Sequence, residues 1–218
     1  MNYFNKVQQK SIVPKGMGLV HKKDQANQIS LRSFFLRDDY VDALSEAIGM
    51  SKFVSFIQLS NVGLTDAKAI KIIQRIDKHA VKRLDLSYNP HLTKKFYTFL
   101  AETIEDPDFN LERLELEGNK MGDHNVDIIC NSLTDTGMSY LNLSKNEITD
   151  KGAPSLARFV AETTSLRILL LHYNRLAGKG GIELGQAIQL NETLQVLDLS
   201  FNAIGGNFKK DTSKLKPS

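Results

Sequence analysis

The 218-residue sequence has a single cysteine and no long hydrophobic run. One cysteine, Cys130, excludes a disulfide framework and any zinc module built on cysteines, and it is typical of a reducing compartment. Residues 1–30 are basic and polar and lack the apolar stretch of a secretory signal. No segment approaches the ~20 consecutive apolar residues of a membrane helix, so no membrane insertion is expected. These absences predict a soluble protein of the cytoplasm.

Positive charge is scarce in the middle of the chain and gathers at its two ends. The net charge of +3 divides into +4 for residues 1–25, −4 for residues 26–202 and +3 for residues 203–218. A nucleic-acid-binding face needs Lys and Arg clustered on folded structure. We therefore expect no nucleic-acid partner, and we expect the basic ends to be solvated or to contact an acidic surface.

A motif of the form L-x-x-L-x-L-x-x-N-x-L recurs along the central part of the chain. It fits residues 54–64, 111–121, 138–148, 166–176 and 194–204, and it fits residues 81–92 with one insertion. A degenerate first copy surrounds Phe34, so the marker positions are 34, 62, 89, 119, 146, 174 and 202. Their spacing of 27 to 30 residues predicts a solenoid of about seven stacked repeats.

Each repeat combines the pattern of a short strand with that of a helix. The L-x-L alternation has period two, which predicts strands centred on residues 30, 58, 85, 115, 142, 170 and 198. Apolar residues then recur at helical spacing and predict six amphipathic helices. The marker asparagines should point inward as a ladder, and an aspartate four residues later should cap the helix, at Asp38, Asp66, Asp123 and Asp150. The strand leucines should all be buried: Leu84, Leu114, Leu141, Leu169 and Leu197.

The copy NEITDKGAPSLARFV (146–160) resembles the ribonuclease-inhibitor-type class of leucine-rich-repeat proteins, whose pattern continues N-x-L-x-D-x-G-A-x-x-L-A. The resemblance extends over residues 26–204. It implies an α/β horseshoe with parallel strands on the concave side and helices on the convex side. Residues 1–25 are then expected to form a basic extended arm, and residues 205–218 a Lys-rich tail. Members of this class include inhibitors, Ran GTPase-activating proteins, tropomodulin-like actin cappers and ciliary regulatory subunits.

Few residues have the spacing that catalysis or ligand binding requires. The histidines lack H-x-x-x-H spacing and no G-x-x-x-x-G-K-[ST] loop is present, so no metal, cofactor or small-molecule substrate is expected. Cys130 falls in a repeat position of small core residues and should be buried. Ser200, His172 and Asp198 could approach one another on adjacent strands, but nothing activates the serine as a nucleophile. The sequence therefore predicts a protein that is not an enzyme.

The predicted concave face becomes apolar and aromatic toward the C-terminus. Its middle repeats hold charged residues such as Asp85 and Glu115, whereas the later repeats hold large aliphatic and aromatic side chains. Such residues in adjacent columns are typical of a partner site. We predict that a protein partner contacts Tyr140, Ile168, Leu170, Tyr173, Val196 and Phe201, with Tyr88 and His172 beside them.

These features favour a non-catalytic protein–protein interaction scaffold, or a structural subunit of a larger assembly. The resemblance suggests a ciliary or axonemal complex, and hence a cytoskeletal location. The alternative is a regulator of a small GTPase resembling the Ran GTPase-activating proteins. That role would need a defined polar surface on one rim, and the N-terminal repeats offer no clear arginine constellation.

No helix is expected after Asn202, because Gly205 and Gly206 disfavour one. The last strand and the outer side of the preceding helix, around Ile182 and Ile188, would then lack the polar cap of a solenoid end. Two interpretations stay open. Either this end docks on a neighbouring subunit, with the Lys-rich tail on an acidic surface, or the chain is a fragment of a longer protein.

Overall fold

The computed structural model describes residues 27–205, in which strands and helices alternate. The strands are β1 (Gln28–Arg32), β2 (Phe56–Ser60), β3 (Arg83–Asp85), β4 (Arg113–Glu115), β5 (Tyr140–Asn142), β6 (Ile168–Leu170) and β7 (Val196–Asp198). The helices are α2 (Asp38–Met50), α3 (Asp66–Ile73), α4 (Lys94–Ile104), α5 (Gly122–Leu133), α6 (Ala153–Glu162) and α7 (Gly178–Leu190). Across this range, none of the helices is long and apolar enough to cross a membrane.

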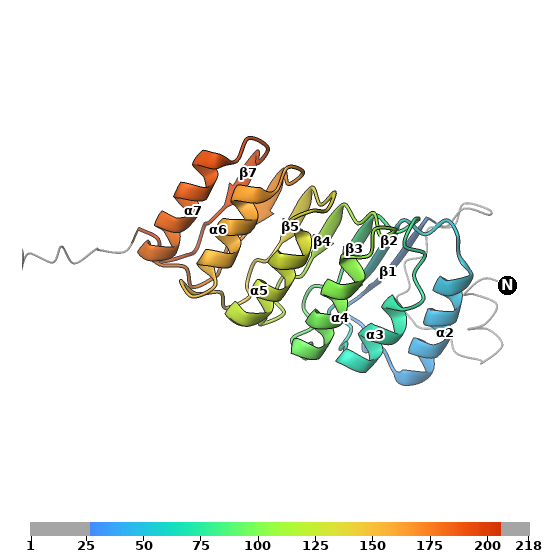
Figure 1. Cartoon of the computed structure of the whole chain (residues 1–218). Coiled ribbons are helices and arrows are strands. Elements are labelled where there is room, and N and C mark those ends of the chain that lie inside the picture. Colours follow the sequence, from blue (N-terminus) through green and yellow to red (C-terminus); the bar gives the residue numbers. More distant parts are fainter. Residues whose placement is uncertain (1–26, 206–218) are drawn as a thin grey trace, which may run out of the picture.

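The strands form one parallel sheet in chain order, from β1 to β7. The helices lie side by side over one face of this sheet, so the molecule is a row of strand–helix units in two layers (Figure 1). We call the uncovered face, the concave side of the predicted horseshoe, the strand face. Each strand is centred within one residue of its predicted position, so the predicted α/β solenoid is confirmed in the described range.

The strand leucines line up in one buried row between the two layers. The pairing register places Leu84, Leu114, Leu141, Leu169 and Leu197 directly beside one another. The first four are at most 1% exposed, as predicted. The prediction was wrong for Leu197, which is only half-buried, because within residues 27–205 no strand or helix comes after β7 to cover it.

The marker asparagines form a ladder that joins successive turns. The backbone N–H of Asn119 donates to Oδ1 of Asn146 at 3.0 Å, and that of Asn146 donates to Oδ1 of Asn174 at 2.9 Å. The Asn146 side-chain amide donates back to the Leu116 carbonyl at 2.8 Å. These amides therefore satisfy backbone groups that would otherwise be buried without a partner.

The predicted helix-capping aspartates do not cap their own helices. Asp38 and Asp66 are already the first residues of α2 and α3, and no side-chain cap is present at either helix. Asp123 instead accepts from the backbone N–H and the hydroxyl of Thr149, both at 2.7 Å. Asp150 accepts from the N–H of Ala177 at 2.6 Å, at the start of α7. These carboxylates therefore link neighbouring repeats.

Candidate functional site

In each repeat, a residue in the turn that follows the strand adopts a left-handed backbone conformation. These residues form one column along an edge of the strand face, which we call the rim column: Ser33, Asn61, Tyr88, Gly118, Lys145, Tyr173 and Phe201. Their φ angles lie between 50° and 70°. A left-handed conformation costs a residue with a Cβ atom roughly 1–2 kcal/mol, whereas glycine and asparagine adopt it more readily. The three aromatic residues of the column are therefore placed at the expense of stability.

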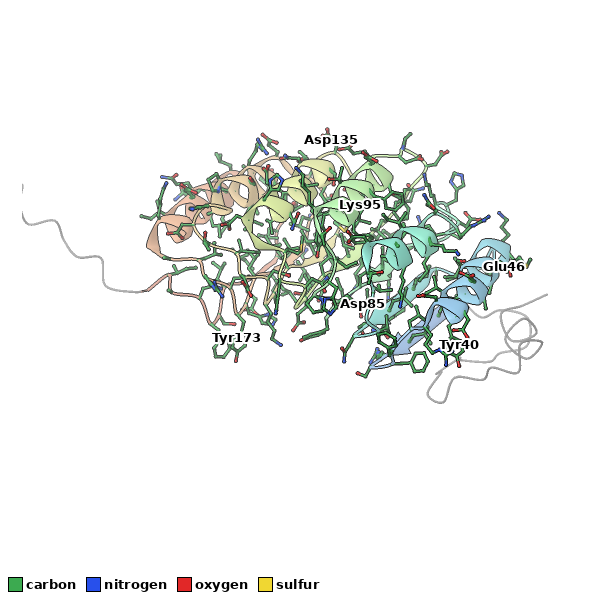
Figure 2. The ribbon with its side chains drawn as sticks, turned by 90° about the horizontal axis from the view of Figure 1, so that it is seen from below. Tyr40, Glu46, Asp85, Lys95, Asp135 and Tyr173 are labelled. Atoms are coloured by element: carbon green, nitrogen blue, oxygen red, sulfur yellow. The ribbon has the colours of Figure 1, made fainter. Side chains whose placement is uncertain are left out.

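Tyr173 and Phe201 form an exposed aromatic pair at the C-terminal end of the rim column. Their rings stack with centroids 4.1 Å apart and planes inclined by 7°. Tyr173 is 50% exposed and Phe201 67% exposed. In Figure 2, Tyr173 lies at the edge of the molecule opposite Asp135 and points away from the ribbon. The pair thus exposes a large apolar surface on a strained backbone.

Lys145 connects this pair to Tyr88 along the same column. Its Nζ lies 5.7 Å from the ring centroid of Tyr173 and 5.3 Å from that of Tyr88. The Tyr88 ring lies over Gly118, where an added Cβ atom would be only 2.7 Å from its Cδ1. The missing side chain of Gly118 therefore lets Tyr88 lie along the rim toward Lys145. We call Tyr88, Lys145, Tyr173 and Phe201 the aromatic stripe.

Glu117 accepts hydrogen bonds from two polar side chains of the aromatic stripe, Lys145 and Tyr88. Its Oε1 accepts from Lys145 Nζ at 2.8 Å and from the Tyr88 hydroxyl, and its Oε2 accepts from the Asn142 amide at 3.2 Å. Burial favours the neutral carboxyl, but the three donors together outweigh it and hold the pKa of Glu117 below its ordinary value of 4.5. The bonds with Glu117 and then Tyr88 raise the pKa of Lys145. Lys145 is therefore a charged and positioned side chain at neutral pH.

Removing the Tyr88 hydroxyl should raise the pKa of Glu117 toward 4.5. The hydroxyl donates to the carboxylate, so Tyr88→Phe weakens the ionised form. In the wild type, the stability gained from ionised Glu117 is present above about pH 4.5 and is lost as the pH falls through its lowered folded-state pKa. Carboxyl-carbon NMR titration measures both pKa values. Tyr140→Phe, at a tyrosine without a hydrogen bond to Glu117, is the control. A Glu117 pKa unchanged by Tyr88→Phe would contradict the assignment.

The remaining apolar residues predicted to bind a partner lie beside the stripe on β5 to β7. Tyr140 pairs in register with Ile168, and Ile168 pairs with Val196, so these three side chains form one row. Val196 is 45% exposed, and the other two are half-buried. Leu170, also half-buried, is two residues from Ile168 on the same strand. The row ends at Arg113 of β4, whose guanidinium lies over the Tyr140 ring, 3.6 Å from its centroid.

His172 lies between the row and the stripe, in contact with carboxylates rather than in a catalytic relay. Its Nδ1 is 2.9 Å from Ser144 Oγ and 3.2 Å from Asp198 Oδ2, and its Nε2 is 4.0 Å from Glu117 Oε1. A serine triad needs the serine and the acid on different ring nitrogens. Ser200 bonds Asp198 instead of His172, at 2.6 Å. The His172 ring meets Tyr173 edge-on at 5.8 Å, which supports Tyr173.

Cys130 lies in the core, as the repeat register predicts, and is 1% exposed. Burial raises the pKa of its thiol to about 12, so the thiol is protonated at neutral pH. A protonated buried thiol is a poor nucleophile.

Seven of the eight predicted residues lie in the last three repeats, from β5 to the turn after β7. Tyr88 lies two repeats earlier, after β3, and is separated from Tyr173 in the rim column by Gly118 and Lys145. Sequence reasoning missed the roles of Glu117, Gly118 and Lys145. The signal that could have found Gly118 and Lys145 is the rim column itself. It contains glycine and asparagine in some repeats, which indicates a left-handed position, and large side chains in others.

Comparisons with known proteins identify the repeat. A family model described as Leucine Rich repeat matches residues 138–157 and 190–207. No curated protein matches the sequence. Among solved structures, the chain is similar to one titled "Leiomodin-1 Actin-Binding Site 2 (ABS2)", with a TM-score of 0.55 and 21% sequence identity. That match covers 63% of this chain and 80% of the other. Likeness at this identity shows the fold, which is an α/β leucine-rich-repeat solenoid.

Proposed function

We propose that this leucine-rich-repeat protein is a non-catalytic scaffold that binds a protein partner with the C-terminal half of its strand face. The observation that carries the proposal is the stacked pair Tyr173 and Phe201, exposed on a left-handed backbone. The left-handed backbone costs the isolated protein free energy, and exposing the two rings to water does not recover it. A partner that buries both rings would offset it, and buried aromatics are typical anchors of protein interfaces.

The surroundings of the pair fit the same role. Ile168, Leu170 and Val196 extend the apolar surface along the strand face, while Lys145 and Glu117 border it with fixed charges. Apolar centres with polar edges are the usual anatomy of a protein interface. In this proposal the binding domain is residues 26–204. The basic arm 1–25, the Lys-rich tail 205–218 and the open C-terminal end offer further contacts.

The proposal also includes the complex in which the protein works and its place in the cell. We place the protein in a larger cytoskeletal complex, with the ciliary axoneme as the setting suggested by the ribonuclease-inhibitor-type resemblance. The structural neighbour carries actin binding in its title, which makes filamentous actin the first defined probe. Regulation of a small GTPase is the alternative. It has less support because Arg113 is engaged by Tyr140 and by Glu115, whose Oε1 is 2.8 Å from its Nε.

Replacing both aromatic residues by asparagine should separate binding from stability. Asparagine tolerates the left-handed backbone, so Tyr173→Asn with Phe201→Asn should leave the thermal midpoint unchanged or raise it. Partner affinity should fall by about 2 kcal/mol or more, which is roughly thirtyfold. The partner is first identified by co-purification with the full chain and mass spectrometry, with filamentous actin tested directly by co-sedimentation. Affinities are then measured by calorimetry.

The matched control is Phe35→Ala, an exposed aromatic (69%) in the first repeat. It should leave the affinity unchanged. Binding through the aromatic pair should also persist at high salt, whereas binding through the basic ends should collapse. An unaltered affinity in the double variant would place the interface elsewhere and overturn the proposal. Accelerated GTP hydrolysis by a partner GTPase would favour the alternative.

A further inference from the structure

Asp198 of β7 places a carboxylate within the apolar part of the strand face. It pairs in register with Leu170 of β6, and Val196 stands two residues before it on the same strand. Its side chain is 35% exposed. Among the described residues, no lysine or arginine lies within ion-pair distance of it, whereas Lys145 is balanced by Glu117 at 2.8 Å. Asp198 therefore leaves one negative charge among the residues proposed to contact the partner.

Two hydrogen bonds from Ser200 keep this carboxylate ionised at neutral pH. Its Oδ1 accepts from the Ser200 hydroxyl at 2.6 Å and from the Ser200 backbone N–H at 2.9 Å, and these bonds hold the pKa of Asp198 below its ordinary value of 3.8. His172 Nδ1 lies 3.2 Å from Oδ2, and a neutral imidazole can donate there without cancelling the charge. The His172 ring also meets Tyr173 edge-on, so it links the carboxylate to the aromatic pair.

Strand β4 shows how a carboxylate in this column is neutralised within the chain. Glu115 stands in the column of Asp198, and Arg113, two residues before Glu115, donates to it from Nε at 2.8 Å. The same guanidinium lies 3.6 Å from the Tyr140 ring centroid. One arginine thus pairs with a carboxylate and covers an aromatic ring at the same time. On β7, Val196 takes the position that Arg113 has on β4, so β7 supplies no such arginine to Asp198.

A partner that covers the apolar residues around Asp198 must also remove this carboxylate from water. Burying an ionised carboxylate without a compensating charge is strongly unfavourable. A purely apolar or an acidic partner surface is therefore selected against at this point. A basic side chain offsets the cost. Arginine does so best, because its planar guanidinium can bind the carboxylate and stack on aromatic rings together, as Arg113 does within the chain.

We propose that the partner contributes an arginine that pairs with Asp198, while apolar side chains next to that arginine cover Tyr173 and Phe201. The occupant of this surface is thus a protein segment in which apolar residues flank a basic one. Asp198 determines specificity, because it discriminates against segments that have the same apolar residues but no basic one. This inference rests on the proposed function, since it requires that the partner cover the C-terminal half of the strand face.

A random library of short peptides, selected on the immobilised full chain, tests this chemistry. The enriched peptides should contain an arginine flanked by apolar residues. The tightest of them is then synthesised with its arginine and with citrulline, which has nearly the same shape but no charge. Calorimetry should show that the wild type binds the arginine peptide at least about tenfold more tightly than the citrulline peptide. In Asp198→Asn, which keeps an acceptor for Ser200, this preference should fall to roughly threefold or less.

The matched control is Asp135→Asn, the same change at an exposed aspartate on the opposite edge of the molecule (Figure 2). It should leave the preference for arginine unchanged. The citrulline comparison on the wild type does not depend on how any variant folds. Enriched peptides that lack basic residues but lose binding in Tyr173→Asn with Phe201→Asn would overturn this inference alone. So would a preference for arginine that persists in Asp198→Asn. Peptides that bind the double variant as tightly as the wild type would instead overturn the proposed function.

Discussion

Replacing Leu141 by alanine should lower the free energy of unfolding by about 2–5 kcal/mol. Leu141 is 0% exposed and lies in register between Leu114 of β4 and Leu169 of β6. Removing its side chain leaves a cavity in the layer that joins the sheet to the helices, and the neighbouring repeats hold the walls of that cavity in place. Urea denaturation of the purified protein, monitored by circular dichroism, measures the change.

Leu197→Ala is the matched control, because Leu197 occupies the same column at the open end. It is only partly buried, so less apolar surface returns to water and no closed cavity forms. In dilute solution, we expect it to cost less than half of the Leu141→Ala value. Equal costs for the two variants would mean that the last repeat is covered as completely as the middle ones.

The arrangement of strands and helices can be predicted from the spacing of apolar residues alone. A period of two identifies each strand, a period near 3.6 identifies each helix, and the recurrence of Asn89, Asn119 and Asn146 sets the register between repeats. Since each repeat contacts only its neighbours, a correct register for one pair carries over to the whole stack. The exception is Leu197, because a strand leucine is fully buried only where a further repeat packs against its own.

Details that depend on contacts between repeats were less predictable. An aspartate near a helix start has the same sequence signature whether it caps its own helix or the next one. In the structure, Asp66 accepts from the Thr93 N–H at 2.8 Å, in the next repeat. The way in which neighbouring repeats pack decides whether the aspartate accepts from its own helix or from the next repeat. The residues around the aspartate in the sequence do not show that packing.

The candidate site was predictable in its location but not in its construction. Tyr173 and Phe201 stand in adjacent repeats of one column, which is visible in the sequence. Their stacking, the position of Lys145 against Tyr173 and the support from Glu117 depend on the left-handed turn that aims the rim side chains. A period count identifies which residues share a column, but it does not give the directions of their side chains.

Asn146→Ala should destabilise the protein by at least about 3 kcal/mol, although it removes only a small side chain. The Asn146 amide is 0% exposed; its oxygen accepts from the N–H groups of Asn119 and Met121, and its nitrogen donates to the carbonyl of Leu116. The alanine variant leaves these three backbone groups buried without partners, each at a cost of roughly 1–3 kcal/mol.

The same substitution at the open end provides the comparison. Asn202 accepts from the Leu176 N–H at 3.0 Å and donates to the Leu171 carbonyl at 2.9 Å, but it is only partly buried. Water can replace these bonds in Asn202→Ala, so a cost of about 1 kcal/mol is expected. Urea denaturation of both variants measures the difference. Equal losses would show that the ladder acts through packing rather than through hydrogen bonds shielded from water. A larger loss of unfolding free energy for Asn146→Ala would show that the interior turns depend on the buried side-chain amide. That amide bonds backbone groups of its own repeat and of the preceding one.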